Sequence, residues 1–226
     1  MASWMVHLRV ADKLMGKIRF VSPTEFIVGN IAPDSGVPNA DWSVFTPSTT
    51  VSHFKTEKGQ KAGPDAFAQK YFLPYMQERY DAKAYSFYLG YLVHLLTDVE
   101  WSKNVVHPAL EKFSEECAAD RNGLIWKMKE DWYDLDFRFL RDHPDFRAFR
   151  IYAEAEGFQN EFMEEFCPDA FDNRRGYITG FYGQQKENLD REYPYLSEAE
   201  MDAFVDLCWQ NILSVLKSSY GLSCCW

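Results

Sequence analysis

The sequence predicts a mostly α-helical protein: a single-domain, multi-helix bundle with a long ordered loop near the N-terminus. Apolar residues recur at helical spacing over most of the 226 residues, whereas the alternation typical of strands is sparse. No internal repeat or linker divides the chain, so we expect residues 1–226 to form one domain. The aromatic content of 17% further predicts that Phe, Tyr and Trp fill much of the core.

The first helix is expected at residues 4–19, because apolar side chains there return to one helix face. These side chains are Val6, Val10, Leu14 and Ile18. Residues 18–21 carry the best strand-like alternation of the chain, but it is weak.

Residues 21–63 are expected to form the long loop, with little regular structure. Glycine, proline, serine, threonine and asparagine are frequent there, which is typical of turns. The segment is nevertheless too apolar for a disordered region. Its large apolar residues are Phe26, Ile27, Ile31, Trp42, Val44, Phe45 and Phe54. We therefore interpret residues 21–63 as an ordered loop packed on the helices, and as a candidate to carry site residues.

Helices are expected over most of the remaining chain. Pro64 suits the first turn of the next helix, which we expect to break or kink near Pro74. Further helices are expected at residues 82–102, 108–118, 122–141, 145–157, 158–166, 174–192 and 197–218. The last of them starts with a capping box made by Ser197 and Glu200.

The composition excludes several classes of protein. With 34 acidic against 24 basic side chains, a net charge of -10 and no dense Lys/Arg stripe, stable binding of nucleic acid is not expected. Small anionic substrates stay compatible with this charge, because a bound divalent metal would reverse the local potential. No signal peptide and no membrane-spanning run is visible, so we expect a cytoplasmic protein. The cysteines include no Cys-x-x-Cys pair, and Cys224 and Cys225 are interpreted as part of a frayed tail.

His94 and Asp98 are the most informative pair of residues. They lie four residues apart in an apolar helical stretch, so both side chains reach a single cation from one helix face. Burying an ionised carboxylate is costly unless it is paired or bound to metal. A metal ion is one interpretation of the pair. A core histidine oriented by an aspartate is the other, and the motif alone favours it.

Three further residues of the same chemistry precede this pair: His7, Asp34 and His53. Each has an ordinary explanation, namely an exposed or capping histidine, a carboxylate that accepts backbone N–H bonds in a turn, and a loop histidine stacked on a ring. Together with His94 and Asp98, however, they form the mixture of imidazole and carboxylate ligands that suits zinc or a similar first-row ion.

Four segments, taken in order, resemble the zinc-dependent phospholipase C and S1/P1 nuclease superfamily, most closely its shorter intracellular bacterial members. They are Trp-x-x-His-Leu-Arg-Val-Ala at residues 4–11, Gly-Asn-Ile-Ala-Pro-Asp-Ser-Gly at 29–36, Ser-His-Phe at 52–54 and Gly-Tyr-x-x-His-x-x-x-Asp at 90–98. The resemblance spans about residues 4–107. It implies that residues 1–226 form a helical domain of this family, which binds up to three zinc ions.

The resemblance also implies roles for the five residues. Asp34, His53, His94 and Asp98 would form the first metal site, and Asp98 would bridge to a second ion held by His7. In secreted relatives the N-terminal tryptophan supplies its amine and carbonyl to that second ion. Here three residues precede the matching tryptophan, so its amine is not free.

The third metal site departs from the family pattern. His107 lies farther beyond the His-x-x-x-Asp motif than in relatives, and His143 lacks the carboxylate that relatives carry four residues later. Asp136 is another candidate ligand, because it lies on an apolar helix face about two turns before His143. The alternative for Asp136 is an ion pair with Arg138 or Arg141.

These residues predict a metal-dependent hydrolase of phosphate esters, a phosphodiesterase or phospholipase C-like enzyme that uses two or more zinc or other divalent transition-metal ions. Asp34 is expected to orient or deprotonate the attacking water, and the substrate to be a small phosphate ester or a phospholipid. One alternative is a non-catalytic interaction module of the same fold, stabilised by metal. Another is a metal-free helical protein whose histidines are satisfied by hydrogen bonds.

Overall fold

Helices make up most of the molecule, and the predicted fold class is confirmed. The computed structural model describes residues 1–18, 22–57, 60–73 and 81–222. The α-helices are α1 (Trp4–Met15), α2 (Pro23–Ile31), α3 (Thr49–Ser52), α4 (Pro64–Phe67), α6 (Ala82–Trp101), α7 (His107–Lys112), α8 (Ser114–Asp142), α9 (Arg147–Glu154), α10 (Ala170–Tyr182) and α11 (Glu198–Ser219). A 3-10 turn (Ala32–Asp34) follows α2, and π-helical turns follow α4 (Ala68–Phe72) and α6 (Ser102–Val106). The antiparallel strands β1 (Val37–Pro38) and β2 (Phe45–Thr46) form a short hairpin.

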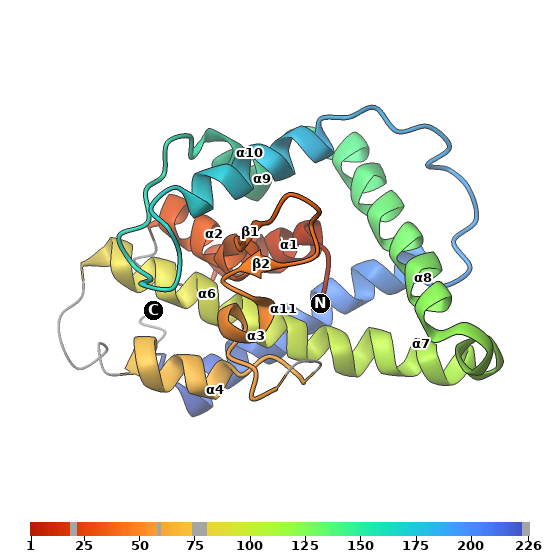
Figure 1. Ribbon diagram of the computed structural model, residues 1–226, viewed down its shortest axis with the longest axis horizontal. Coiled ribbons are helices and arrows are strands. Elements are labelled where there is room, and N and C mark those ends of the chain that lie inside the picture. The colour runs from red at the N-terminus through yellow and green to blue at the C-terminus, as the bar shows by residue number, and fades with distance from the viewer. Residues whose placement is uncertain (19–21, 58–59, 74–80, 223–226) are drawn as a thin grey trace.

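The long helix α6 is the centre of the fold. It crosses the molecule between α2 and α11 (Figure 1), and nearly all of its side chains from residue 86 to residue 98 are buried. Its closest neighbour is α2, and two glycines permit the close approach. A Cβ atom on Gly29 would lie 2.2 Å from the Phe87 carbonyl oxygen, and one on Gly90 would lie 2.1 Å from the Phe26 carbonyl oxygen. The contact between these two backbones therefore fixes the relative positions of the side chains on α2 and α6.

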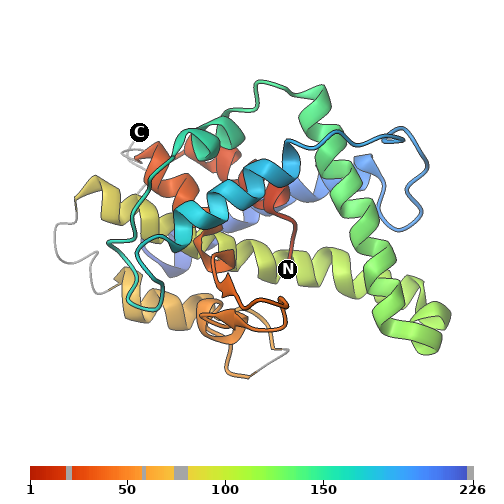
Figure 2. The same cartoon turned by 45° about the horizontal axis from the view of Figure 1, so that its top comes forward.

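The N-terminal end of the chain lies beside α6 in both views of the ribbon (Figures 1 and 2). The Ala2 backbone N–H donates a hydrogen bond of 2.9 Å to Asp98 of α6. The helix α1 that follows is buried through Met5, His7, Leu8 and neighbouring side chains. Its Ser3 cap accepts a hydrogen bond from the backbone N–H of Val6.

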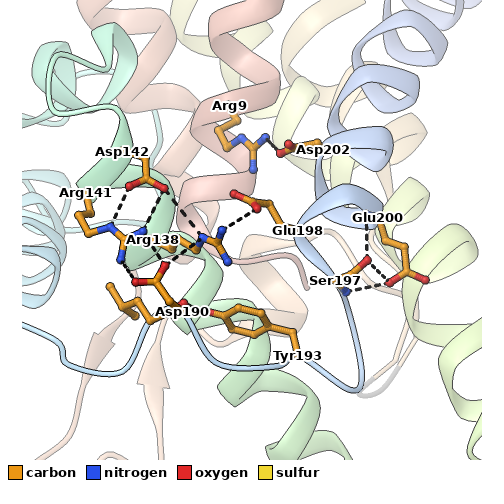
Figure 3. Close-up of polar contacts among 11 residues, drawn as sticks. Arg9, Arg138, Arg141, Asp142, Asp190, Tyr193, Ser197, Glu198, Glu200 and Asp202 are labelled. Carbon is orange, nitrogen blue, oxygen red and sulfur yellow. Dashed lines mark hydrogen bonds and ion pairs between the residues drawn. The ribbon is translucent and has the colours of Figure 1, made fainter.

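Ion pairs tie the C-terminal end of α8 to its neighbours (Figure 3). The Arg138 guanidinium lies 3.0 Å from the Glu198 carboxylate at the start of α11. The Arg141 guanidinium contacts Asp190, in the segment between α10 and α11, at 2.9 Å. Both arginines of this cluster therefore have carboxylate partners, and they share Asp142 and Asp190.

The expectation of a loop with little regular structure over residues 21–63 is wrong for its first part, where α2 forms. The two residues that suggested a loop belong to this helix: Pro23 occupies its first turn, and Gly29 makes the close contact with α6. Beyond the 3-10 turn the expectation holds better, since only the β1–β2 hairpin and the single turn of α3 interrupt irregular structure.

The helix expected at residues 158–166 is wrong. That segment is irregular, because the Asn160 side chain replaces the hydrogen bonds of a helix. Its amide donates to the carbonyl groups of Met163 and Phe166, and its oxygen accepts from the backbone N–H groups of Phe162 and Met163. The helix expected at residues 108–118 is wrong as a single element, because α7 ends at Lys112 and α8 begins at Ser114. The remaining expected helices exist with shifted ends.

The helix expected at residues 174–192 begins earlier and ends at Tyr182. The kink near Pro74, most of the alternation at residues 18–21, and both Cys224 and Cys225 lie outside the described residues. Within the described part of the chain, no helix is both long enough and apolar enough to span a bilayer.

Candidate metal centre

Five residues that are far apart in the sequence converge beside α6: His7, Asp34, His53, His94 and Asp98. His7 comes from α1, Asp34 from the end of the 3-10 turn, His53 from the end of α3, and His94 and Asp98 from α6 itself. The ligand atoms of His7, His94 and Asp98 all lie within 4.8 Å of one another, and so do those of Asp34, His53 and His94. His94 is common to both groups, so the five side chains form one cluster.

The distances within the cluster match those between ligands of one metal ion. The His53 Nε2 atom lies 3.5 Å from Asp34 Oδ1, 3.5 Å from Asp98 Oδ2 and 3.4 Å from His94 Nε2. The Nε2 atoms of His7 and His94 lie 3.5 Å and 3.8 Å from the Asp98 carboxylate. Zinc bonds of about 2.0–2.1 Å in tetrahedral geometry would place ligand atoms roughly 3.3 Å apart. The cluster therefore needs little movement to hold such an ion.

Backbone contacts orient His94 for this role. Its Nδ1–H donates a 2.7 Å hydrogen bond to the Asn30 carbonyl oxygen, which has no proton of its own to offer. The neutral ring then carries its lone pair on Nε2, the atom that faces His53 and Asp98. A backbone acceptor behind a histidine is the usual arrangement around a metal ligand.

His53 is oriented by its own neighbour. The Ser52 hydroxyl lies 3.0 Å from its Nδ1 atom, and the Ser52 carbonyl accepts a hydrogen bond from the Tyr91 hydroxyl of α6. The Nε2 atom of His53 thereby points at both carboxylates of the cluster. Tyr91 fixes the short helix α3 on α6, so the position of His53 depends on the packing of the core.

His7 argues most directly for a bound cation. Its ring is fully buried and stacks on the His94 ring, with centroids 3.7 Å apart and planes within 4°. Neither of its nitrogens has a hydrogen-bond partner. A buried polar atom without a partner costs about 1–3 kcal/mol, so a protein rarely keeps one without a ligand. A metal ion between His7 and Asp98 would satisfy the Nε2 atom, which faces that carboxylate.

Electrostatics keep the ligand atoms in the forms that bind metal. Burial, with the neighbouring His7 charge, lowers the pKa of His94 to about 3, so its ring stays neutral. Burial opposes the ionisation of Asp34, but its contact with His53 and the nearby histidines hold the pKa of Asp34 below its usual range. Burial likewise opposes ionisation of Asp98, yet the nearby amino terminus and the histidines lower its pKa well below normal. Neutral imidazoles and ionised carboxylates are the metal-ligating forms.

A cavity of about 250 Å³ opens next to the cluster on the side of Asp34. The Asp34 side chain is 10% exposed, whereas that of His53 is completely buried. Besides Asp34, the cavity is lined by Met1, Ala2, Ser3, Trp4, Pro33, Gly36, Phe45, Pro47, Thr49, Ser52, Lys129, Trp132, Tyr133 and Arg174. Asp34 is thus the member of the cluster that a small molecule in this cavity would meet.

Asp136 lies elsewhere, in a hydrogen-bonded site of its own. It accepts hydrogen bonds from the Ser3 hydroxyl at 2.9 Å and from the Tyr182 hydroxyl at 2.7 Å. The alternative considered for Asp136, an ion pair with Arg138 or Arg141, is wrong, since both arginines face other carboxylates. Burial raises the pKa of Asp136 to about 7.

Two other candidate residues also lie apart from the cluster. His143 is exposed, stacks on the Phe139 ring and contacts the Phe139 carbonyl oxygen at 2.9 Å. His107 is exposed at the start of α7 and lines a second depression together with Asp98 and Ser102. Neither belongs to the two ligand groups found among the described residues.

The arrangement of helices and this cluster agree with one family. Residues 6–178 match the family described as zinc dependent phospholipase C, which is more than half of the chain. The chain belongs to that family. Neither the curated proteins nor the solved structures compared with it include a match.

Membership of the zinc-dependent phospholipase C family confirms the resemblance found in the sequence. It also supports zinc as the metal and a metal-dependent phosphoesterase at the level of the family. The matched region includes all five residues of the cluster and the cavity-lining Lys129 and Arg174.

Sequence reasoning did not find Lys129 and Arg174. Lys129 lies on α8 and Arg174 on α10, and neither belongs to a motif that signals a site. Only the fold brings side chains of these two helices to one cavity with Asp34.

Proposed function

We propose that this protein hydrolyses phosphate esters with water activated by zinc ions, which are held by His7, Asp34, His53, His94 and Asp98. The observation that carries the proposal is the cluster itself: three imidazoles and two carboxylates, buried together at distances that suit zinc. Zinc bound there would lower the pKa of a bound water toward neutrality and stabilise the charge that grows on the phosphoryl oxygens.

The residues of the cluster would have two roles, holding the metal and orienting the attacking water. His7, His53, His94 and Asp98 are almost fully enclosed, so they serve to hold the metal. Asp34 faces the cavity, and as a carboxylate it can accept the hydrogen bond of an attacking water and orient it toward phosphorus. The cavity next to Asp34 would receive the ester.

The cavity favours catalysis over a purely structural metal site. Structural zinc sites are closed by four protein ligands, whereas catalytic sites keep a position open to a small molecule. Here Asp34 reaches a cavity large enough for a phosphate ester. Small phosphodiesters and phospholipid head groups are the substrate classes that fit both the family and the size of this cavity.

The test is hydrolysis of bis(p-nitrophenyl) phosphate and of p-nitrophenylphosphorylcholine by protein supplemented with zinc. We expect activity that a chelator removes and that zinc restores. His53→Ala should lower kcat/KM by about 100-fold or more, because His53 contacts both carboxylates. His143→Ala is the matched control, since it removes an exposed histidine outside the cluster. Full activity in His53→Ala, or no hydrolysis by the zinc-supplemented wild type, would contradict the proposal.

A further inference from the structure

The cavity beside Asp34 is lined by two cationic side chains, Lys129 and Arg174. They come from different helices, α8 and α10, and neither contributes to the metal cluster. The protein as a whole is acidic, with a net charge of -10, so a pair of cations at one cavity runs against its overall charge. Their surroundings show that this charge is not neutralised within the fold.

Arg174 is 8% exposed, and it is the only buried arginine or lysine among the residues that the structure describes. Its Nη2 atom donates a 2.8 Å hydrogen bond to the Gly36 carbonyl oxygen. The guanidinium also lies near two rings, 6.0 Å from the Trp4 centroid and 5.5 Å from that of Tyr177. Within the described part of the chain, no carboxylate forms an ion pair with it. A buried cation without a counter-charge is costly, so an anionic ligand would stabilise it.

Lys129 is half-buried and also lines this cavity. Its ammonium group lies 4.7 Å from the centre of the Trp126 ring, and among the described residues it has no ion-pair partner. Burial lowers the pKa of Lys129, an effect that the charge of Asp34 partly opposes. The electrostatic influence of Asp34 agrees with the position of both side chains at one cavity.

The arginines at the end of α8 differ from Lys129 because they have carboxylate partners. Arg138 and Arg141 each face carboxylates from neighbouring segments (Figure 3), so their charges are used to hold the fold together. Lys129 lies on the same helix but faces the cavity without such a partner. An ammonium and a planar guanidinium at one site are the groups that bind phosphate oxygens.

We propose that Lys129 and Arg174 form an anion-binding subsite beside the metal centre, which favours substrates that carry a phosphate monoester or another anionic group over substrates with a cationic choline head group. Metal ions bound to the cluster would take up the charge of Asp34 and Asp98, which leaves the positive charge of the subsite for the substrate. The preference for anionic substrates rests on the proposed function. The binding of anions by Lys129 and Arg174 does not, and it can be measured without enzymatic turnover.

The first test is calorimetric titration of the protein, as purified, with inorganic phosphate. We expect Lys129→Gln to weaken phosphate binding about tenfold, the loss typical of one charge-assisted hydrogen bond. Lys129→Arg keeps the charge and should bind phosphate within about threefold of the wild type. Lys127→Gln is the matched control, because it removes the same charge from α8 two residues away, where the lysine pairs with Glu116 outside the cavity.

Arg174→Lys probes the second residue while keeping its charge. We expect weaker phosphate binding, because the planar fork of the guanidinium is lost. Arg174 also holds the Gly36 carbonyl, so this variant is checked for an unchanged circular dichroism spectrum. The Lys129 variants test the subsite independently of Arg174.

The second test compares hydrolysis of p-nitrophenyl phosphate, which is dianionic, with that of p-nitrophenylphosphorylcholine. We expect Lys129→Gln to lower the ratio of the two kcat/KM values about tenfold, chiefly through a higher KM for the dianion. Lys127→Gln should leave the ratio unchanged.

The outcomes separate this inference from the proposed function. Phosphate binding that depends on Lys129, without hydrolysis of any ester, would support the subsite and reject the proposed function. Zinc-dependent hydrolysis with the same phosphate affinity and the same substrate ratio in wild type and Lys129→Gln would reject the subsite alone. An equal loss of affinity in Lys127→Gln and Lys129→Gln would also overturn it, because the effect would then come from the overall charge.

Discussion

Two clusters of charged and polar side chains in this protein differ in what completes them. At the end of α8, Arg138 and Arg141 meet carboxylates at distances of 2.9–3.0 Å, so both cations have counter-charges within the fold (Figure 3). Beside α6, the histidines and carboxylates approach one another at 3.4–3.8 Å, and neither nitrogen of His7 has a hydrogen-bond partner. In the first cluster the protein itself supplies carboxylates to each arginine, whereas in the second a bound cation would supply the partner that the buried His7 ring lacks.

The two clusters also differ in how much they are expected to contribute to the stability of the fold. Exposed ion pairs contribute little, because solvent screens them and the long side chains lose freedom. The buried cluster is held in place by the core: by the close contact of α2 with α6, by the Asn30 carbonyl behind His94, and by Tyr91 behind His53. Changes in the two clusters should therefore have very different consequences.

The largest effect is expected from removing a residue of the buried cluster. His94→Ala and Asp98→Ala should each abolish zinc-dependent activity, with kcat/KM lowered by about 1000-fold or more, because His94 belongs to both ligand groups and Asp98 contacts three histidines. Steady-state kinetics with saturating zinc would measure it. Retention of full activity by His94→Ala would exclude the proposed centre.

The next effect concerns the helix contact that positions the cluster. Gly90→Ala places a methyl group only 2.1 Å from the Phe26 carbonyl oxygen, so α2 must move away from α6. We expect a loss of about 3 kcal/mol or more in the free energy of unfolding, together with weaker zinc binding. Denaturant unfolding would measure the stability.

Gly176→Ala is its control, because the added methyl group on α10 meets no atom within 4 Å. That variant should be unchanged or stabilised by up to about 1 kcal/mol, since alanine favours a helix more than glycine does. Equal stability of Gly90→Ala and the wild type would contradict the role assigned to the α2–α6 contact.

Asp136 provides a test that depends on pH. Burial raises its pKa in the folded protein to about 7 from 3.8, so the folded state keeps a proton that the unfolded chain loses. The contribution of Asp136 to stability is therefore present at low pH and falls as the pH rises from about 4 to about 7. Relative to Asp136→Asn, the wild type should lose about 2 kcal/mol of stability between pH 5 and pH 8.

Thermal unfolding of both proteins at the two pH values measures this difference, and Asp145→Asn at an exposed position serves as control. Any effect of pH on the histidines of the metal cluster is shared by wild type and variant and cancels in the comparison. A difference in stability between the two proteins that does not change with pH would contradict the raised pKa of Asp136.

The smallest effect is expected at the cluster of Figure 3. Arg141→Gln removes contacts with Asp142 and Asp190, both exposed partners, and should cost about 1 kcal/mol or less. Activity should stay within about twofold of the wild type. A loss of activity as large as that of His94→Ala would remove the distinction between the two clusters.

The helical class could be predicted from the apolar spacing of the sequence. The meeting of His7, Asp34, His53, His94 and Asp98 was implied only by the resemblance of their four segments to a known family, because each residue alone also has an ordinary explanation. The sequence did not predict α2, since Pro23 and Gly29 are also typical of loops, and only the contact with α6 distinguishes a helix start and a packing glycine from a turn.

The sequence also did not reveal the irregular segment after α9 or the cationic side of the cavity. At residues 158–166 the apolar spacing suits a helix, but the side chain of Asn160 competes successfully for the backbone hydrogen bonds. Lys129 and Arg174 belong to no sequence motif. Only the folded structure shows that both line the cavity beside Asp34.

The central claim is that the buried cluster holds metal, and the most direct test is the metal content of the protein. Elemental analysis of purified, desalted wild type after incubation with zinc should find two or more ions per chain, and His94→Ala should hold fewer. His143→Ala should match the wild type, because His143 lies outside the cluster. Wild-type protein that stays free of metal after incubation with zinc, manganese and iron would contradict the account.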